Sequence, residues 1–178
     1  MRRVLDEYSI TRADSDEVDR LVEINLAADR LFDDTGLIDD ASLLEHVPET
    51  VFADAIAMSH LFVVRGDYGE AVGFTLTSVR DGMLYLDQVS VHPDHGRKGL
   101  GAALVNRVID DARHRGLKSV ALSTFRDLPW NGPFYKKLGF REIPRSRLAD
   151  WMLELEAVQA ETLDVSKRCF MRRRVSWF

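Results

Sequence analysis

Cysteine is scarce in this sequence, and long apolar runs are missing. Its one cysteine, Cys169, cannot form an internal disulfide, so nothing requires an oxidising compartment. No segment reaches the uninterrupted apolar length of roughly 20 residues that crosses a bilayer. Residues 1–7 meet acidic side chains too early to resemble a secretion signal. We therefore expect a cytoplasmic protein that makes no use of a membrane.

Basic residues are also in the minority. Lys and Arg total 24 against 29 Asp and Glu, a formal net charge of −5, which argues against nucleic acid as a general partner. Internal repeats, low-complexity tracts and linkers rich in glycine, serine or proline are missing too. What is present is 46% hydrophobic and 30% charged residues over 178 positions, which is typical of one globular core. We expect a single domain over residues 1–178.

Apolar periodicity predicts strands and helices in alternation. Strands are expected over 8–12, 61–64, 71–79, 84–91, 118–124, 140–143 and 168–175. Helices are expected from the capping pair Asp14 and Glu17 to about residue 31, between 40 and 59 with an interruption at Pro48, and over 101–115, 131–139 and 145–163. Asn131 is expected to cap the helix over 131–139 and Gly139 to close it. Arg172–Arg174 is expected on a solvent-facing edge strand.

The order of these elements predicts the sheet. Tight turns join the strands between residues 61 and 91, which favours an antiparallel meander. A strand, helix, strand sequence then follows across 101–115, which normally forms a right-handed parallel crossover. The expected fold is α/β of the α+β type: a mixed, mostly antiparallel sheet of about seven strands flanked by helices.

A basic glycine loop leads from the strand at 84–91 into the helix at 101–115. Gly96, Gly99 and Gly101 allow close backbone approach, while Arg97 and Lys98 add positive charge beside the unpaired N–H groups of a helix start. The loop matches neither the P-loop nor the three-glycine dinucleotide spacing. A pyrophosphate would suit it, and a merely structural strand-to-helix turn is the alternative.

Three segments together resemble the GNAT superfamily of acyl-CoA-dependent N-acyltransferases: residues 86–93, 96–102 and 131–140. The family's loop motif begins with Gln or Arg where this chain has Gly96, so a side-chain contact at that position is lost while the backbone cradle remains. The resemblance implies the GNAT fold and acetyl-CoA as cosubstrate. The residues it assigns to cofactor binding are Val89, Ser90, Val91, Gly96, Arg97, Lys98, Gly99, Leu100, Gly101, Ala102, Asn131 and Phe134.

The same resemblance places Tyr135 beside the cofactor sulfur as general acid. A phenol with a pKa near 10 can protonate a departing thiolate, whose conjugate acid has a pKa near 8.5; the alternative is an aromatic packed beside Phe134. Asp87 is the best-placed carboxylate to help deprotonate an ammonium acceptor. It shares a strand face with Val89 if no bulge intervenes, and it could instead pair with a nearby Arg or Lys.

The acceptor site is expected at Phe32, Asp33, Leu37 and Ser123. Aspartates near a cleft attract amines, although they also cap helices and solvate turns. Direct attack is favoured over an acyl-enzyme because Cys169 lies in an apolar strand, where thiols are usually inert. His92 and His95 lack clustered ligands, so no metal is expected.

These features favour an N-acetyltransferase that moves an acetyl group from acetyl-CoA to a small primary amine in a ternary complex. The alternatives are an acyl-CoA-binding sensor without activity, for which Tyr135 would have no use, and an acetyltransferase for protein N-termini or lysines. Oligomeric state, including a homodimer, stays open at this point.

Overall fold

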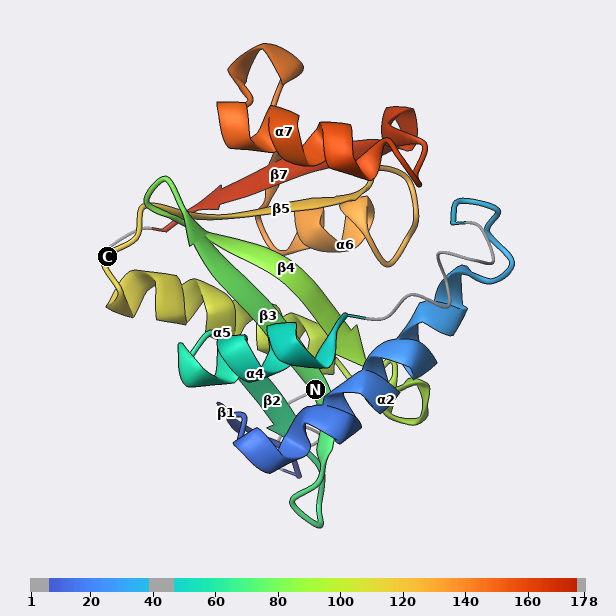
Figure 1. The fold of residues 1–178 in the computed structure, drawn as a ribbon, viewed down its shortest axis with the longest axis vertical. Coiled ribbons are helices and arrows are strands. Elements are labelled where there is room, and N and C mark those ends of the chain that lie inside the picture. Colours follow the sequence, from blue (N-terminus) through green and yellow to red (C-terminus); the bar gives the residue numbers. More distant parts are fainter. Residues whose placement is uncertain (1–6, 39–46, 176–178) are drawn as a thin grey trace.

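The structure, a computed structural model, describes residues 7–38 and 47–175 and has a seven-stranded sheet of order β1-β2-β3-β4-β5-β7-β6 (Figure 1). The strands are β1 (Ser9–Arg12), β2 (Leu61–Arg65), β3 (Ala71–Arg80), β4 (Met83–Val91), β5 (Ser119–Phe125), β6 (Arg141–Glu142) and β7 (Arg168–Arg174). The α-helices are α2 (Val18–Asp29), α4 (Glu49–Ala57), α5 (Leu100–His114), α6 (Gly132–Lys137) and α7 (Asp150–Gln159). Short 3-10 turns are η1 (Ser15–Glu17), η2 (Arg30–Phe32), η3 (Pro93–His95), η4 (Arg145–Arg147) and η5 (Val165–Lys167).

The predicted mixed sheet is confirmed. β2, β3 and β4 form the antiparallel meander, and α5 connects β4 to its parallel neighbour β5. The helix expected between residues 40 and 59 begins after Pro48, where proline can occupy a helix start but not its interior; residues 40–46 lie outside the described part.

Two local predictions are wrong. Arg172–Arg174 does not lie on an edge, because the two-residue strand β6 pairs with β7 at Arg141–Arg172 and Glu142–Met171. Asn131 stands at the N-terminus of α6, but its side chain makes no capping hydrogen bond. Gly139 does close that helix region as predicted, with a φ of +83° in the left-handed region that favours glycine.

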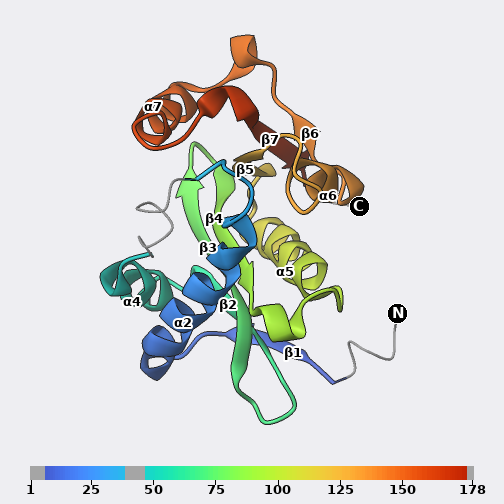
Figure 2. The same ribbon diagram turned by 90° about the vertical axis from the view of Figure 1, so that its right-hand side faces the viewer.

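Helices cover both faces of the sheet. Figure 2 shows α2 and α4 on one side of β2 to β4 and α5 on the other, with α7 on the α2 side and α6 on the α5 side. Leu21, Ile24 and Phe52 pack with Phe74 on the first face. On the second face the buried stripe of α5 packs on β4 and β5; it includes Leu104, Val105, Val108, Ile109 and Ala112.

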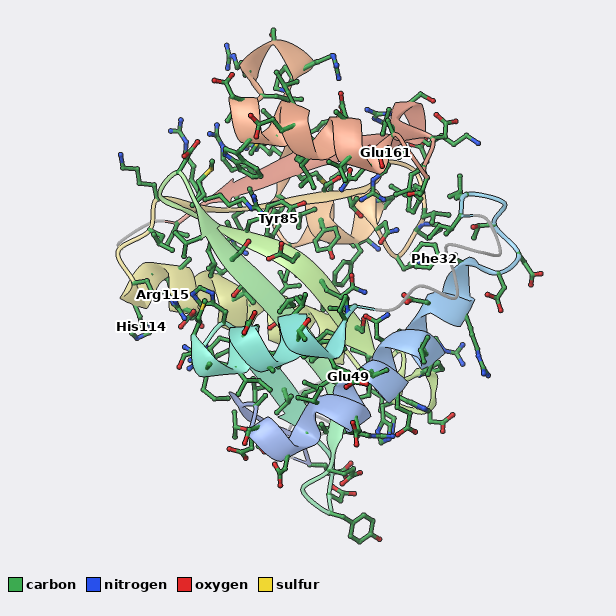
Figure 3. All side chains as sticks on the ribbon, in the orientation of Figure 1. Phe32, Glu49, Tyr85, His114, Arg115 and Glu161 are labelled. Atoms are coloured by element: carbon green, nitrogen blue, oxygen red, sulfur yellow. The ribbon has the colours of Figure 1, made fainter. Side chains whose placement is uncertain are left out.

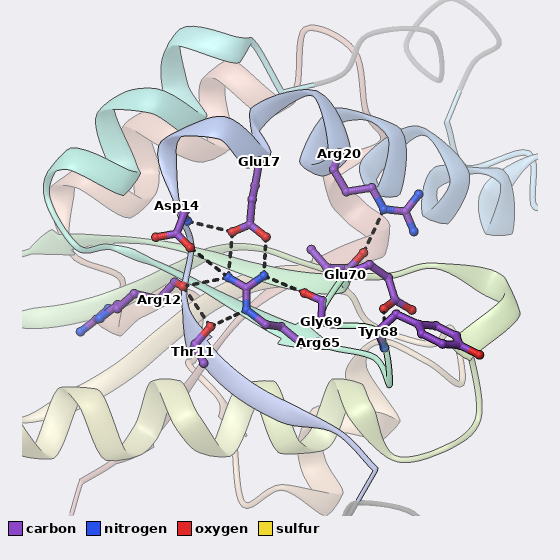
Figure 4. Close-up of polar contacts among 10 residues, drawn as sticks. Thr11, Arg12, Asp14, Glu17, Arg20, Arg65, Tyr68, Gly69 and Glu70 are labelled. Carbon is purple, nitrogen blue, oxygen red and sulfur yellow. Dashed lines mark hydrogen bonds and ion pairs between the residues drawn. The ribbon is translucent and has the colours of Figure 1, made fainter.

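The start of the first helix is fixed to the sheet by one arginine. The predicted capping pair is present, with the Asp14 N–H donating to Glu17 Oε2 at 2.8 Å. Arg65 on β2 donates to the same carboxylate, with Nη2 2.9 Å from Oε2, and also forms an ion pair with Asp14 (Figure 4). Because the Arg65 and Glu17 side chains are both mostly buried, this bidentate pair holds η1 and α2 against the sheet edge.

The sheet is nearly divided at its centre. β4 and β5 are paired at only two positions, Leu84 with Val120 and Tyr85 with Ala121, after which the strands diverge. We call this divergence, between residues 86–91 of β4 and 122–125 of β5, the splay. It separates a β1–β4 half from a β5–β7 half and positions the site described next.

Candidate active site

A β-bulge at Asp87 sets the directions of the side chains on β4. Leu76 pairs with Gln88 and Thr77 pairs with Leu86, so Asp87 is the extra residue between them. Ser78, Arg80 and Tyr85 are near the Asp87 carboxyl, which places Asp87 on the face covered by α2 and α7. Val89 packs on the α5 face instead. The predicted sharing of one face by Asp87 and Val89 therefore fails, because the bulge reverses the alternation.

Backbone groups of β4 point into the splay. The His92 N–H donates to Val72 O at 2.8 Å, which makes these two residues a hydrogen-bonded pair of the β3–β4 ladder. Hydrogen-bonded and non-bonded pairs alternate along antiparallel strands. The backbone N–H and C=O of Ser90 therefore bond to β3. Those of Val89 and Val91 point away from β3, towards the side where β5 diverges.

The glycine loop delivers further N–H groups at one end of the splay. Gly99 is the N-cap of α5 with a φ of +83°, and the first intrahelical donor is the Ala103 N–H to Gly99 O at 3.0 Å. The N–H groups of Leu100, Gly101 and Ala102 precede it and have no intrahelical acceptor. Together with the positive end of the helix dipole they form an anion-binding site.

Gly96 differs from the other loop residues because its N–H is bonded within the turn. Its N–H donates to Pro93 O at 2.9 Å, and a Cβ there would lie 3.0 Å from the same oxygen. The close approach accounts for glycine at this position and leaves the Gly96 N–H committed to the turn. Arg97 follows with a φ of +59°, an unusual value outside glycine that occurs at functional turns.

Lys98 is held at the loop by the start of the first strand. Its Nζ donates to the Tyr8 hydroxyl at 3.0 Å, and the same oxygen lies 3.2 Å from His95 Nδ1. The hydrogen bond to Tyr8 raises the pKa of Lys98, which keeps the ammonium charged beside the helix start.

The second sequence motif meets the first at α6. The Phe134 ring lies 3.7 Å from the Cβ position of Gly101, so the start of α5 and the start of α6 are in contact. Gly132 is buried, and a Cβ there would come within 2.1 Å of Arg126 O. Asn131 precedes it, half-buried and without a capping contact.

Tyr135 is packed among aromatic rings. The side chain is only 6% exposed and its ring centroid is 5.0 Å from that of Phe134 and 5.7 Å from that of Phe140. Its hydroxyl has no hydrogen-bond partner within residues 7–38 and 47–175. Burial, with the nearby Tyr85, raises the pKa of Tyr135, so the phenol keeps its proton at neutral pH.

Asp87 is the carboxylate at the splay. Its side chain is exposed, yet enough protein surrounds the carboxyl that desolvation raises its pKa to about 6, against the opposing effects of the Ser78 hydroxyl and the Arg80 guanidinium. A carboxyl with a pKa near 6 is mostly ionised at neutral pH and remains basic enough to take a proton from an amine.

The predicted acceptor residues are only partly brought together. The Phe32 ring, at the end of η2, lies 5.7 Å from the Phe125 ring at the end of β5 and 6.3 Å from the Trp130 ring. Asp33 is exposed and Leu37 is half-buried on the turn that follows. Figure 3 shows Phe32 beyond α2 and Tyr85 near the level where β4 and β5 part.

Ser123 lies on the same sheet face as Tyr85, and its neighbours could not be predicted from the sequence. Its hydroxyl donates to Gln159 Oε1 at 3.1 Å and accepts from Arg168 Nη2 at 3.2 Å. Tyr85, Gln159 and Arg168 were not predicted as site residues. The sheet register brings Tyr85 and Arg168 to one face, and the last residue of α7 adds Gln159.

Cys169 is buried as predicted, and burial raises its pKa to about 11, so it is a poor nucleophile. Across the described residues, no three His, Cys, Asp or Glu side chains gather as metal ligands. Nor does any helix in those same ranges combine the length and apolarity that a membrane crossing requires.

Comparisons with known proteins place the chain in a family. The acetyltransferase (GNAT) family matches residues 18–140. The [ribosomal protein bS18]-alanine N-acetyltransferase of Escherichia coli strain K12 is 32% identical over 74 residues, which cover 42% of this chain and 50% of that protein. The chain therefore aligns with about half the length of this curated relative.

Solved structures share the fold at low sequence identity. The ribosomal-protein-S18-alanine N-acetyltransferase from Escherichia coli has a TM-score of 0.67 at 20% identity, covering 95% of this chain and 94% of that one. The PaiA N-acetyltransferase from Thermoplasma acidophilum, in complex with coenzyme A, has a TM-score of 0.73 at 14% identity, covering 94% and 98%. With its sequence match over most of its length, the chain belongs to the GNAT family of acetyltransferases.

Proposed function

We propose that this protein transfers the acetyl group of acetyl-CoA to a primary amine by direct attack in a ternary complex. The observation that carries the proposal is the splay beside the uncapped start of α5. The splay offers backbone amides at the spacing of an extended strand, and the start of α5 offers converging amides with positive charge beside them. Together they fit a long, thin ligand with a pyrophosphate at one end. Acetyl-CoA supplies the acetyl group as a thioester.

Each end of the cofactor has its own residues in this proposal. The N–H groups of residues 99–102, with Arg97 and Lys98, bind the pyrophosphate. The backbone of Val89 and Val91 aligns the pantetheine arm, while Asn131 and Phe134 bound the arm on the α6 side. Within the splay, the Val89 N–H donates to the thioester carbonyl oxygen and stabilises the negative charge that develops there.

Proton transfers are assigned to two side chains. Asp87 receives the proton from the ammonium acceptor, directly or through water, which frees the nitrogen lone pair. Tyr135 donates its proton to the departing thiolate as the C–S bond breaks, and its raised pKa keeps that proton available. The second proton that the nitrogen loses as the amide forms returns to the Tyr135 phenolate. Phe32 and Ser123 are the predicted contacts of the acceptor, with Asp33 and Leu37 at its outer rim.

Release of free CoA from acetyl-CoA, measured with a panel of amines, tests the proposal. Tyr135→Phe should lower kcat about 10²- to 10⁴-fold with little change in KM for acetyl-CoA, because the ring still fills its packed site. Tyr68→Phe is the control, since Tyr68 is 96% exposed on a hairpin turn. Equal rates for wild type and Tyr135→Phe would remove the assigned acid.

An acetyltransferase for protein N-termini is the second candidate. It is supported by the 32% identity to an enzyme whose name specifies a ribosomal-protein alanine. Peptides with free N-terminal alanine, compared with the same peptides blocked by an N-terminal acetyl group, distinguish this candidate from a small-amine enzyme. CoA binding without turnover of any acceptor would favour the sensor instead.

A further inference from the structure

The acceptor side of the splay contains an arginine whose charge no carboxylate balances. Arg168 on β7 is half-buried and forms no ion pair with an Asp or Glu of the described ranges. Several other partly buried arginines in those ranges have carboxylate partners; they include Arg12, Arg65, Arg115 and Arg126. Arg107, which covers the Phe62 ring, and Arg173, which donates to Leu138 O, also lack such a partner there but do not contact Ser123. An unbalanced charge in a desolvated place is costly, which makes it a candidate for ligand binding.

Neutral groups hold the Arg168 guanidinium in place. Its Nε donates to Gln159 Oε1 at 3.3 Å and its Nη2 to Ser123 Oγ at 3.2 Å. Its central carbon lies 4.7 Å from the centroid of the Phe125 ring. These contacts use two of the five N–H donors and fix the direction of the fork without neutralising it.

The direction of the fork is towards the splay. Phe125, which the guanidinium covers, contacts Phe32 of η2. The charge of Arg168 also reaches Tyr85, where it opposes the increase that burial causes in the pKa of that phenol. Arg168 therefore extends back over β5 towards β4, on the sheet face that carries Asp87.

Asp87 and Arg168 thus lie on one face, two strands apart in the order β4-β5-β7. Neighbouring strands are about 4.8 Å apart, so their backbones are separated by roughly 10 Å or more, and the arginine side chain shortens that gap. A ligand between them meets an anionic group at one end and a cationic group at the other.

We propose that the acceptor carries a carboxylate as well as its amine, and that Arg168 binds this carboxylate while the amine faces Asp87. This inference rests on the proposed function and names its substrate class: amino acids or short acidic peptides. Arg168 is a binding and specificity residue in this scheme and takes no part in proton transfer.

The first test compares kcat/KM for two pairs of acceptors. One pair is a free amino acid and its C-terminal amide; the other is an amidated tripeptide with Asp at the second position and the same peptide with Asn there. The first pair tests an α-carboxylate and the second a side-chain carboxylate. Wild type should prefer the acid of one pair by about 30-fold or more, as expected for a desolvated ion pair. Arg168→Gln should abolish that preference, and Arg168→Lys should restore part of it.

Arg174→Gln, at an exposed position of the same strand, is the matched control and should keep the preference. Equal use of acid and amide by wild type, or an equal loss on both in Arg168→Gln, would overturn the inference while leaving acetyl transfer intact. Loss of all turnover would instead count against the proposed function.

A second measurement does not depend on turnover. N-acetyl amino acids should raise the Tm of the CoA-bound wild-type protein more than their amides do, and Arg168→Gln should remove the difference. Equal shifts for acid and amide in wild type would contradict the inference even if no acceptor is found.

Discussion

At the scale of the residue, Asp87 combines its proposed role with an unfavourable environment. Desolvation raises its pKa from 3.8 to about 6, so the folded state binds the proton more tightly than the unfolded chain does. Between pH 4 and 6 the unfolded chain carries fewer protons at this group, so stability falls as pH rises through that window. The ionised form at neutral pH is therefore a cost to the fold.

Asp87→Asn should raise Tm above pH 6 and have no effect on Tm below about pH 4, because the cost arises only from the ionised carboxyl. The same change should remove the increase in kcat/KM that wild type shows as pH rises through about 6. Thermal melts and rate profiles from pH 4 to 9 check both results. A variant that is less stable than wild type at pH 7.5 would contradict the assigned environment.

Residue roles differ in how far the sequence could predict them. Tyr135 was identified through its motif, and its packing beside Phe134 is also present, so the two readings of this residue are compatible. Arg168 could not be identified, because nothing near it in the sequence shows that Ser123 and Gln159 would be its neighbours. Contacts across 45 and 9 positions of sequence exist only after the sheet is assembled.

At the scale of the element, the start of α5 depends on glycine for two separate reasons. Gly99 needs its φ of +83°, and the place where its Cβ would lie is open space. A strained backbone and a free approach to the helix start therefore occur at one residue.

Gly99→Ala should destabilise the protein by about 1–2 kcal/mol through backbone strain and weaken CoA binding, because the new methyl group occupies the approach to the amides. Gly69→Ala is a close control: Gly69 has a φ of +82° and equally open surroundings, but it lies on the hairpin between β2 and β3. It should cost similar stability and leave CoA affinity unchanged, as calorimetry can measure. A similar loss of affinity in both variants would contradict the role of the loop.

Most element boundaries followed from apolar periodicity and turn residues, since these depend on local sequence. The bulge in β4 did not. The sequence of β4 alone cannot show that it has one residue more than its partner. The extra residue is defined by pairing with β3, in which Leu76 and Thr77 face Gln88 and Leu86. The interior position of β7 could not be predicted either, because it depends on pairing with the two-residue strand β6.

At the scale of the whole molecule, the two halves of the sheet share just two paired strand positions within residues 7–38 and 47–175, and α5 packs across both halves. The helix packs on β4 and β5 in one cluster and on β2 and β3 in another. A ligand seated in the splay would contact both halves and add to this limited connection.

Coenzyme A at about 100 times its Kd should stabilise the protein by about 2.7 kcal/mol, which corresponds to an increase in Tm of roughly 5–10 °C for a chain of this size. Hydrogen exchange should slow most at residues 86–91 and 122–125. A shift in Tm without protection of these two segments would place the ligand elsewhere. That residues 1–178 form one domain stays a prediction, which a single cooperative transition in these melts would support.

The reversal of side-chain direction at the bulge also bears on the kinetics. The carboxylate that we assign to the acceptor faces one side of the sheet, and the loop that we assign to the acyl carrier opens from the α5 side. With these assignments neither reactant passes the other on its way in, so we expect no compulsory order of addition. Double-reciprocal plots should intersect for both substrates, and each product should compete with its own precursor alone.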